Sequence, residues 1–134
     1  MTQEEKDLLL KDLCARLPYF TKVQIKNEIV VLDSICDDDG YHFNFIGDDR
    51  EGVNIEQVKP YLFPLSSMTE EQLYNNPIGF SQMLTIKADR DWENITINRR
   101  AYYKLVDWFN KNHFDYRGLI EKGLAIDATD KNIY

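Results

Sequence analysis

The chain has 134 residues, of which 43% are hydrophobic and 13% aromatic, and it carries a net charge of −7 at pH 7. A chain of this size and composition buries enough apolar surface to fold without disulfide bonds or metals, so we predict one domain over residues 1–134. The negative charge argues against direct binding to nucleic acid or to an anionic membrane.

The sequence contains no stretch of 18 apolar residues, so it predicts no membrane-spanning helix. The acidic opening segment, residues 1–6, is not followed by the apolar stretch of a secretory signal, so we predict a cytoplasmic protein. The two cysteines, Cys14 and Cys36, fall in apolar patterns and lack the spacing of a metal or redox site, which predicts two buried thiols.

The negative charge is concentrated in one short segment, residues 33–56, which we call the acidic segment. It contains one basic residue, Arg50, and eight acidic residues: Asp33, Asp37, Asp38, Asp39, Asp48, Asp49, Glu51 and Glu56. The rest of the chain has 15 acidic and 15 basic residues, so the acidic segment alone accounts for the net charge.

At the N-terminus the pattern predicts a helix over residues 3–16. Thr2 followed by Glu5 matches a capping box, in which each side chain accepts a hydrogen bond from the other residue's backbone N–H. Apolar residues then recur at helical spacing until Pro18 ends the helix.

The next part of the chain alternates apolar and polar residues, which predicts strands over 22–26, 29–36 and 41–46. Short turns separate them, including Asp38-Asp39-Gly40, so we predict an antiparallel meander. A short fourth strand is predicted over 53–55, extending at most to residue 58. Prolines flank the apolar segment 59–65, which we expect to lie extended across the sheet.

The C-terminal half is predicted to be largely helical. A second capping box, Thr69 with Gln72, begins a short helix that ends before Pro77. The run 83–86 is typical of a strand, and the charged segment 89–93 is typical of an exposed turn.

From about residue 98 the apolar spacing predicts a long helix that ends at Asn112. Asp115 is then expected to cap a short helix over 116–122, and the tail, 124–134, is expected to be loosely held. Together these elements predict an α+β fold. It would have an N-terminal helix, a meander of three to five strands that can curl into a small SH3-like barrel, and C-terminal helices packed on it.

The acidic segment is the first candidate site, with an acidic patch formed by Asp37, Asp38, Asp39, Asp48 and Asp49. It lacks the alternating ligands and the final glutamate of a calcium loop, so we predict no metal. Aspartates also favour turns, so one interpretation is a solvated turn. The other is an anionic surface that attracts a basic protein partner or mimics nucleic-acid phosphates.

The second candidate, residues 108–118, places several aromatic rings at a predicted corner between helices. One hypothesis is a binding surface formed by Trp108, His113, Tyr116 and Arg117, since tryptophan, tyrosine and arginine often anchor interfaces. His113 and Asp115 could act as a catalytic base and its orienting group, although no nucleophile stands beside them. The simpler interpretation is a packed corner in which Asp115 only caps a helix.

Several well-known chemical motifs are missing from the sequence. It contains no phosphate-binding glycine loop, paired zinc ligands, nucleophile elbow or metalloprotease helix. We therefore predict no cofactor and assign no catalytic residue.

Four segments carry a resemblance to known sequences. They are MTQEEKDLLLKDLCARLPY at 1–19, VKPYLFPLSSMTEE at 58–71, WFNKNHFDYRGLI at 108–120 and GLA at 123–125. Together they resemble a family of uncharacterised short proteins of gut Bacteroidetes genomes and of their phages or prophages. The resemblance implies a bacterial or phage setting and a cytoplasmic location, and it assigns no catalytic residue.

Three functional hypotheses follow. The first is a small non-enzymatic interaction protein, of bacterial or mobile-element origin, that binds a protein partner. The second is an acidic inhibitor that occupies the site of a nucleic-acid-binding protein. The third is a small enzyme that uses His113, Asp115 and Tyr116.

Overall fold

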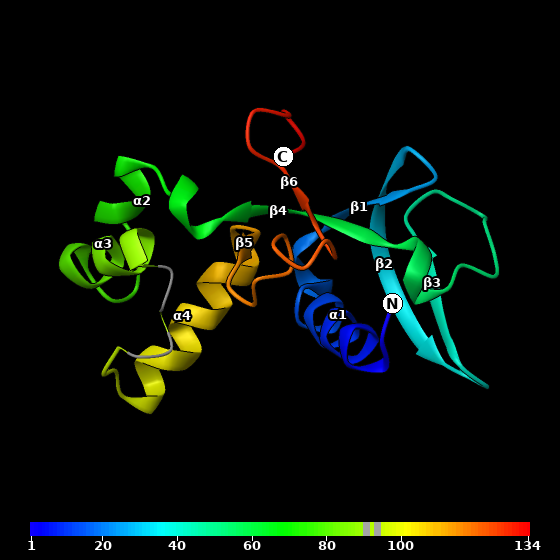
Figure 1. Ribbon diagram of the computed structural model, residues 1–134, viewed down its shortest axis with the longest axis horizontal. Coiled ribbons are helices and arrows are strands. Elements are labelled where there is room, and N and C mark those ends of the chain that lie inside the picture. The colour runs from blue at the N-terminus through cyan, green and yellow to red at the C-terminus, as the bar shows by residue number, and fades with distance from the viewer. Residues whose placement is uncertain (90–91, 93–94) are drawn as a thin grey trace.

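The computed structural model describes residues 1–89, Trp92 and 95–134, and it shows an α+β fold with a mixed sheet (Figure 1). The helices of this described part are α1 (Gln3–Ala15), α2 (Glu70–Tyr74), α3 (Phe80–Asp89) and α4 (Arg99–Lys111). Its strands are β1 (Lys22–Ile25), β2 (Glu28–Asp37), β3 (Tyr41–Phe45), β4 (Lys59–Pro64), β5 (Phe114–Asp115) and β6 (Ile126–Asp127). Within the same residues, no helix has the length and apolar character needed to cross a membrane.

The sheet has the strand order β3-β2-β1-β4-β5, and β6 also pairs with β4. Neighbours from β3 to β4 are antiparallel, whereas β4 runs parallel to β5 and β6. The predicted meander and the α+β class are therefore confirmed. The sheet is open, and among the described residues no pairing closes it into an SH3-like barrel.

Local sequence signals correctly placed the starts of α1, α2 and α4. Thr2 and Glu5 form the predicted capping box of α1, and Thr69 and Gln72 form that of α2. Asn98 caps α4 by accepting a hydrogen bond from the amide of Ala101, at 2.9 Å. These motifs need only residues three positions apart, which is why the sequence alone predicts them.

The predicted fourth strand at 53–55 is wrong. Asn54 instead caps a single 3-10 turn, Ile55–Gln57, and the strand that follows is β4. The segment expected to lie across the sheet is thus a strand within it. Its prolines, Pro60 and Pro64, stand near the two ends of β4, where the loss of an N–H costs least, and the apolar residues between them form the buried middle.

The prediction of a strand at 83–86 is also wrong, because these residues lie inside α3. Met83 and Ile86 are buried and three residues apart, so they lie on one face of a helix. The predicted exposed turn at 89–93 contains Trp92, which is instead buried. The remaining part of that turn, residues 90, 91 and 93, lies outside the described residues.

The C-terminal segment differs most from expectation. Instead of a helix over 116–122, the chain forms turns in which Gly118 and Gly123 have positive φ angles, a conformation that opposes helix formation. The tail is not loosely held, because β6 pairs with β4 and the amide of Ala128 donates to the carbonyl of Leu62 at 2.8 Å.

The prediction of two buried thiols is wrong. Cys14 and Cys36 are exposed and unbonded to each other. Cys14 lies beside the apolar stripe of α1 rather than within it, and Cys36 lies on the outer face of β2 near the hairpin turn.

The core divides into two clusters. The meander cluster packs α1 against β1–β3 and β4; its buried members include Leu9, Leu13, Val23, Leu32, Phe43, Leu62 and Leu119. The helical cluster lies among α2, α3, α4 and β5; its members include Leu65, Met83, Ile86, Trp92, Leu105, Phe109, Phe114 and Tyr116. Figure 1 shows the two groups of elements at opposite ends of the molecule, with β4 running between them.

The last residue anchors the tail to the sheet. The ring of Tyr134 stacks on His113, with ring centroids 3.7 Å apart. Its hydroxyl donates to the carbonyl of Tyr61 at 2.9 Å and accepts from the amide of Lys22 at 2.9 Å. One side chain thus joins β1, β4 and the corner after α4.

We expect Tyr134→Phe to lower the free energy of unfolding by about 1 kcal/mol, because two backbone groups lose their partner while the ring stays in place. Urea denaturation measures the change. Tyr103→Phe is the matched control, since Tyr103 is exposed and its hydroxyl bonds to none of the described residues. Equal effects of the two substitutions would show that the hydroxyl of Tyr134 does not anchor the tail.

Candidate functional site

The aromatic residues of the second candidate lie largely inside the protein. Tyr116 is buried, and Trp108 is half-buried on α4. Tyr116 stacks on Phe109, with centroids 5.4 Å apart, and Trp108 stacks on Phe114 at 5.5 Å. These rings therefore build the helical cluster, which supports the interpretation of a packed corner.

Hydrogen bonds fix the orientation of Tyr116. Its hydroxyl donates to Oδ1 of Asn110 at 2.9 Å, and the indole N–H of Trp92 donates to its carbonyl at 2.8 Å. Burial raises the pKa of the Tyr116 phenol above its usual value. A phenol held in this way is a structural group.

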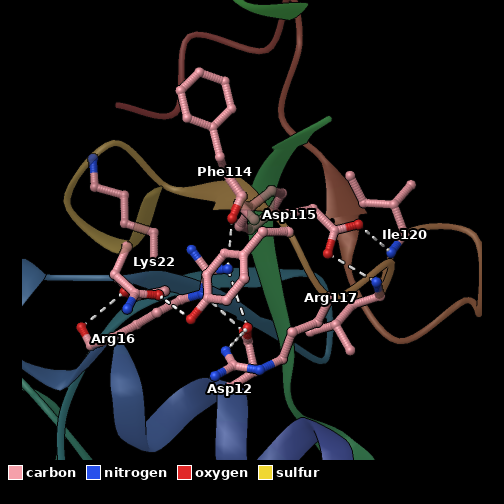
Figure 2. Close-up of polar contacts among 12 residues, drawn as sticks. Asp12, Arg16, Lys22, Phe114, Asp115, Arg117 and Ile120 are labelled. Atoms are coloured by element: carbon pink, nitrogen blue, oxygen red, sulfur yellow. Dashed lines mark hydrogen bonds and ion pairs between the residues drawn. The ribbon is translucent and has the colours of Figure 1, made fainter. Parts of the chain in front are cut away.

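A buried ion pair lies where the two core clusters meet (Figure 2). Asp12 and Arg16, one turn apart on α1, have no exposed surface. Two hydrogen bonds join them: Arg16 Nε donates to Asp12 Oδ2 at 2.8 Å, and Arg16 Nη2 donates to Asp12 Oδ1 at 3.1 Å. This two-pronged geometry is the strongest that a guanidinium and a carboxylate can adopt.

The ion pair also binds the corner after α4. Arg16 Nη2 donates to the carbonyl oxygen of Phe114 at 2.6 Å, and Arg117 Nη1 donates to Asp12 Oδ1 at 2.8 Å. The guanidinium of Arg117 lies 4.5 Å from the ring centre of Tyr116, and that of Arg16 lies 5.3 Å from it. Arg117, predicted as a binding residue, is thus engaged in holding the fold together.

Asp115 is occupied by backbone amides. Its carboxylate accepts from the amides of Leu119 at 2.8 Å and Ile120 at 2.9 Å, and Figure 2 shows it pointing away from Arg16. Burial raises the pKa of Asp115, although these two amides oppose the shift. Asp115 therefore caps a turn where a helix was expected.

His113 is not paired with Asp115 among the described residues. Its Nδ1 atom is buried without a hydrogen-bond partner, and its ring packs against Tyr134. Burial, with the nearby charges of Arg16 and Lys22, lowers the pKa of His113 to about 4. The enzyme hypothesis needs His113, Asp115 and Tyr116 to converge in an open pocket. Asp115 and Tyr116 line one hollow, and His113 is not among its described lining residues.

The acidic segment is arranged differently, since most of its side chains face solvent. Two of its eight acids have ionic partners: Asp48 pairs with Arg50 at 2.8 Å, and Glu56 pairs with Lys6 at 2.9 Å. The hydrogen bonds from Arg50 lower the pKa of Asp48. Arg50 also pairs with Glu28 of β2, so the single base of the acidic segment is already engaged.

Six acids remain, and we call them the unpaired acids: Asp33, Asp37, Asp38, Asp39, Asp49 and Glu51. All are exposed, and their side chains have no hydrogen-bond or ion-pair partner within the described part of the chain. They lie on β2, on the β2–β3 turn and on the loop after β3. No cluster of ligands suited to a metal ion occurs among the described residues.

A hollow of about 430 Å³ lies beside β3, between the hairpin and the loop after it. Its lining includes His42, Phe43 and Asn44 of β3 and two of the unpaired acids, Asp38 and Glu51. Asp38 is thus shared by the acidic patch and the hollow. The hollow was not predicted, because it depends on how the loop folds back toward the hairpin.

Comparisons with known proteins add no assignment: no family model matches the chain, and no curated protein or solved structure matches it either. The resemblance to Bacteroidetes and phage proteins stays a prediction.

We expect Asp12→Asn to lower the free energy of unfolding by about 3 kcal/mol, because it leaves the buried Arg16 without a counter-charge. Thermal or chemical denaturation measures the loss. Asp7→Asn, on the exposed face of the same helix, is the control and should change stability by less than about 0.5 kcal/mol. A small loss for Asp12→Asn would mean that the charge of Asp12 is not needed to keep Arg16 buried.

His113 should make stability fall in acid. The unfolded chain binds a proton at His113 below about pH 6.5, whereas the folded chain binds it only near pH 4, so lowering the pH through this window favours unfolding. We expect the stability difference between the wild type and His113→Gln to shift by on the order of 2 kcal/mol between about pH 7 and pH 4. His42→Gln is the control, and because His42 is exposed, its stability difference from the wild type should not change with pH. If the stability difference between the wild type and His113→Gln were the same at every pH, the prediction would be contradicted.

Proposed function

We propose that this protein is a non-enzymatic interaction module that binds a protein partner through its acidic segment. The observation that carries the proposal is the set of six unpaired acids, exposed together at one end of the molecule. The β2–β3 hairpin and the loop after it hold them, at the end opposite α2 and α3 (Figure 1).

Unpaired, exposed acids are suited to attracting a basic surface. An acid already bound to an arginine or lysine loses much of its field, as Asp48 does with Arg50. The unpaired acids keep theirs, and like charges close together raise the local potential and steer an oppositely charged partner. Such attraction acts over roughly 8–10 Å at physiological salt and weakens as salt is added.

The packing of the aromatic corner supports the same conclusion. Tyr116 and Arg117, two of the four residues first considered as anchors, are engaged with Asn110 and Asp12. Recruiting them to a partner would break contacts that join the two core clusters. The side chains of the unpaired acids make no such internal contact within the described part of the chain, so they are the better candidate for a contact surface.

The acidic inhibitor is the second candidate, and the same surface favours it. A cluster of exposed carboxylates presents the kind of negative field that a nucleic-acid-binding protein recognises in phosphates. The two candidates differ in what the partner does with the contacted site. An inhibitor must prevent its partner from binding DNA or RNA, whereas an interaction module need not.

The test is affinity capture from a bacterial lysate with two variants of equal charge. One removes five unpaired acids (Asp37→Asn, Asp38→Asn, Asp39→Asn, Asp49→Asn and Glu51→Gln). The control removes five exposed acids elsewhere (Glu4→Gln, Glu70→Gln, Glu71→Gln, Asp89→Asn and Asp130→Asn).

We expect the wild type and the control to retain the same partner at about 50 mM salt and to release it at about 500 mM, and the first variant to lose it. Retention of that partner by the first variant, with both variants folded by circular dichroism, would contradict the proposal. Addition of DNA or RNA to the captured complex then separates the candidates, because only an inhibitor's partner is released by nucleic acid.

A further inference from the structure

β3 is the terminal strand of the sheet. It pairs with β2 on one side only, from Asp37 opposite Tyr41 to Leu32 opposite Phe45. In an edge strand, alternate backbone N–H and C=O groups point away from the neighbour and can pair with another strand. Within the described residues, a turn that brings Asp48 to Phe45 closes one end of this edge, and the rest is open.

The open part of the edge adjoins the hollow beside β3. Its lining comes from β3 (His42, Phe43 and Asn44), from Cys36 of β2 and Asp38 of the turn, and from Glu51 and Gly52 of the loop after β3. The exposed side chains of His42 and Asn44 alternate with the buried Phe43 and Phe45, as expected of a regular strand. β3 itself is extended from Tyr41 to Phe45, although its register with β2 shifts between Leu32 and Ser34. An extended edge beside free volume meets two requirements for adding a strand.

The charge around this edge selects what can be added. Asp37, Asp38 and Asp39 stand at one end of β3, and Asp49 and Glu51 stand in the loop beside it. A second copy of this chain would bring the same charges against them, and like charges placed opposite each other oppose pairing. A segment rich in lysine or arginine would instead meet five unpaired acids.

We infer that β3 accepts an extended basic segment of a protein partner as an additional strand. The inference rests on the proposed function and specifies its partner: an extended segment whose backbone pairs with Tyr41–Asn44 and whose lysine or arginine side chains reach Asp38 and Glu51. Backbone hydrogen bonds supply affinity in this mode of recognition, and the side chains that alternate along the segment supply specificity.

Three synthetic peptides of about seven residues test the inference, a length that matches a typical strand. The first alternates lysine and valine. The second alternates lysine and proline, so it has the same charge, but each proline holds φ near −65°, away from the roughly −140° of an antiparallel strand. The third alternates glutamate and valine. Binding is measured by calorimetry at low salt, and hydrogen exchange of the β3 amides is followed by NMR.

We expect the lysine–valine peptide to bind at least about tenfold more tightly than the lysine–proline peptide, as loss of the ladder bonds implies. It should also slow amide exchange within Tyr41–Asn44. The glutamate–valine peptide should not bind. The double variant Asp38→Lys, Glu51→Lys should reverse the preference and bind the glutamate–valine peptide, whereas Glu70→Lys, Glu71→Lys on α2 should behave as the wild type.

The outcomes separate this inference from the proposed function. Equal binding of both lysine peptides, with no slowing of exchange in β3, would overturn strand addition and leave a charge-based contact. Binding of no peptide, together with self-association of the variant that lacks five unpaired acids, would show that these acids only protect the edge. That result also overturns the inference, while the lysate experiment decides the proposed function independently.

Discussion

Burial of the Asp12–Arg16 ion pair is the constraint on which the arrangement of the two clusters depends. Removing a carboxylate and a guanidinium from water is costly, and the cost is offset only when their hydrogen-bonding groups find partners. Asp12 accepts three hydrogen bonds, two of them from Arg16, and Arg16 donates one more to the carbonyl of Phe114, while its Nη1 atom has no partner among the described residues. Since α1 belongs to the meander cluster and Phe114 to the helical cluster, satisfying the ion pair requires that the clusters meet in one orientation.

The corner that the ion pair contacts also differs from the predicted helix over 116–122. A helix over 116–122 was predicted because Asp115 is a good cap and Gly123 a good terminator. The chain instead forms β5 beside β4, which turns the carbonyl of Phe114 toward Arg16, and Asp115 caps the following turn through Leu119 and Ile120. Gly118 and Gly123 take positive φ angles in the turns that follow, so the local helix signal is not realised there.

What the sequence could predict follows from how far apart the interacting residues are. Capping boxes, alternating strands and the Asp38-Asp39-Gly40 turn involve neighbours a few residues apart, and all were predicted. The parallel pairing of β4 with β6 joins residues more than 60 positions apart, so no local pattern reveals it. The run 83–86 shows the ambiguity of short apolar stretches, because burial of Met83 and Ile86 fits either a strand or a helix until their spacing is weighed.

The two candidate sites divide along the same line. The acidic segment could be located from the sequence because its charge can be counted directly. The role of the aromatic corner depends on distant partners such as Asp12. The i,i+4 spacing of Asp12 and Arg16 is equally typical of an exposed ion pair on a helix, so it did not reveal their burial. The sheet ends at the two-residue strands β5 and β6 on one side and at the longer β3 on the other. Evolution commonly protects such an edge with charge. Here the protecting charge is of one sign and unpaired, so the feature that prevents the edge from joining a copy of itself also makes it complementary to a basic strand.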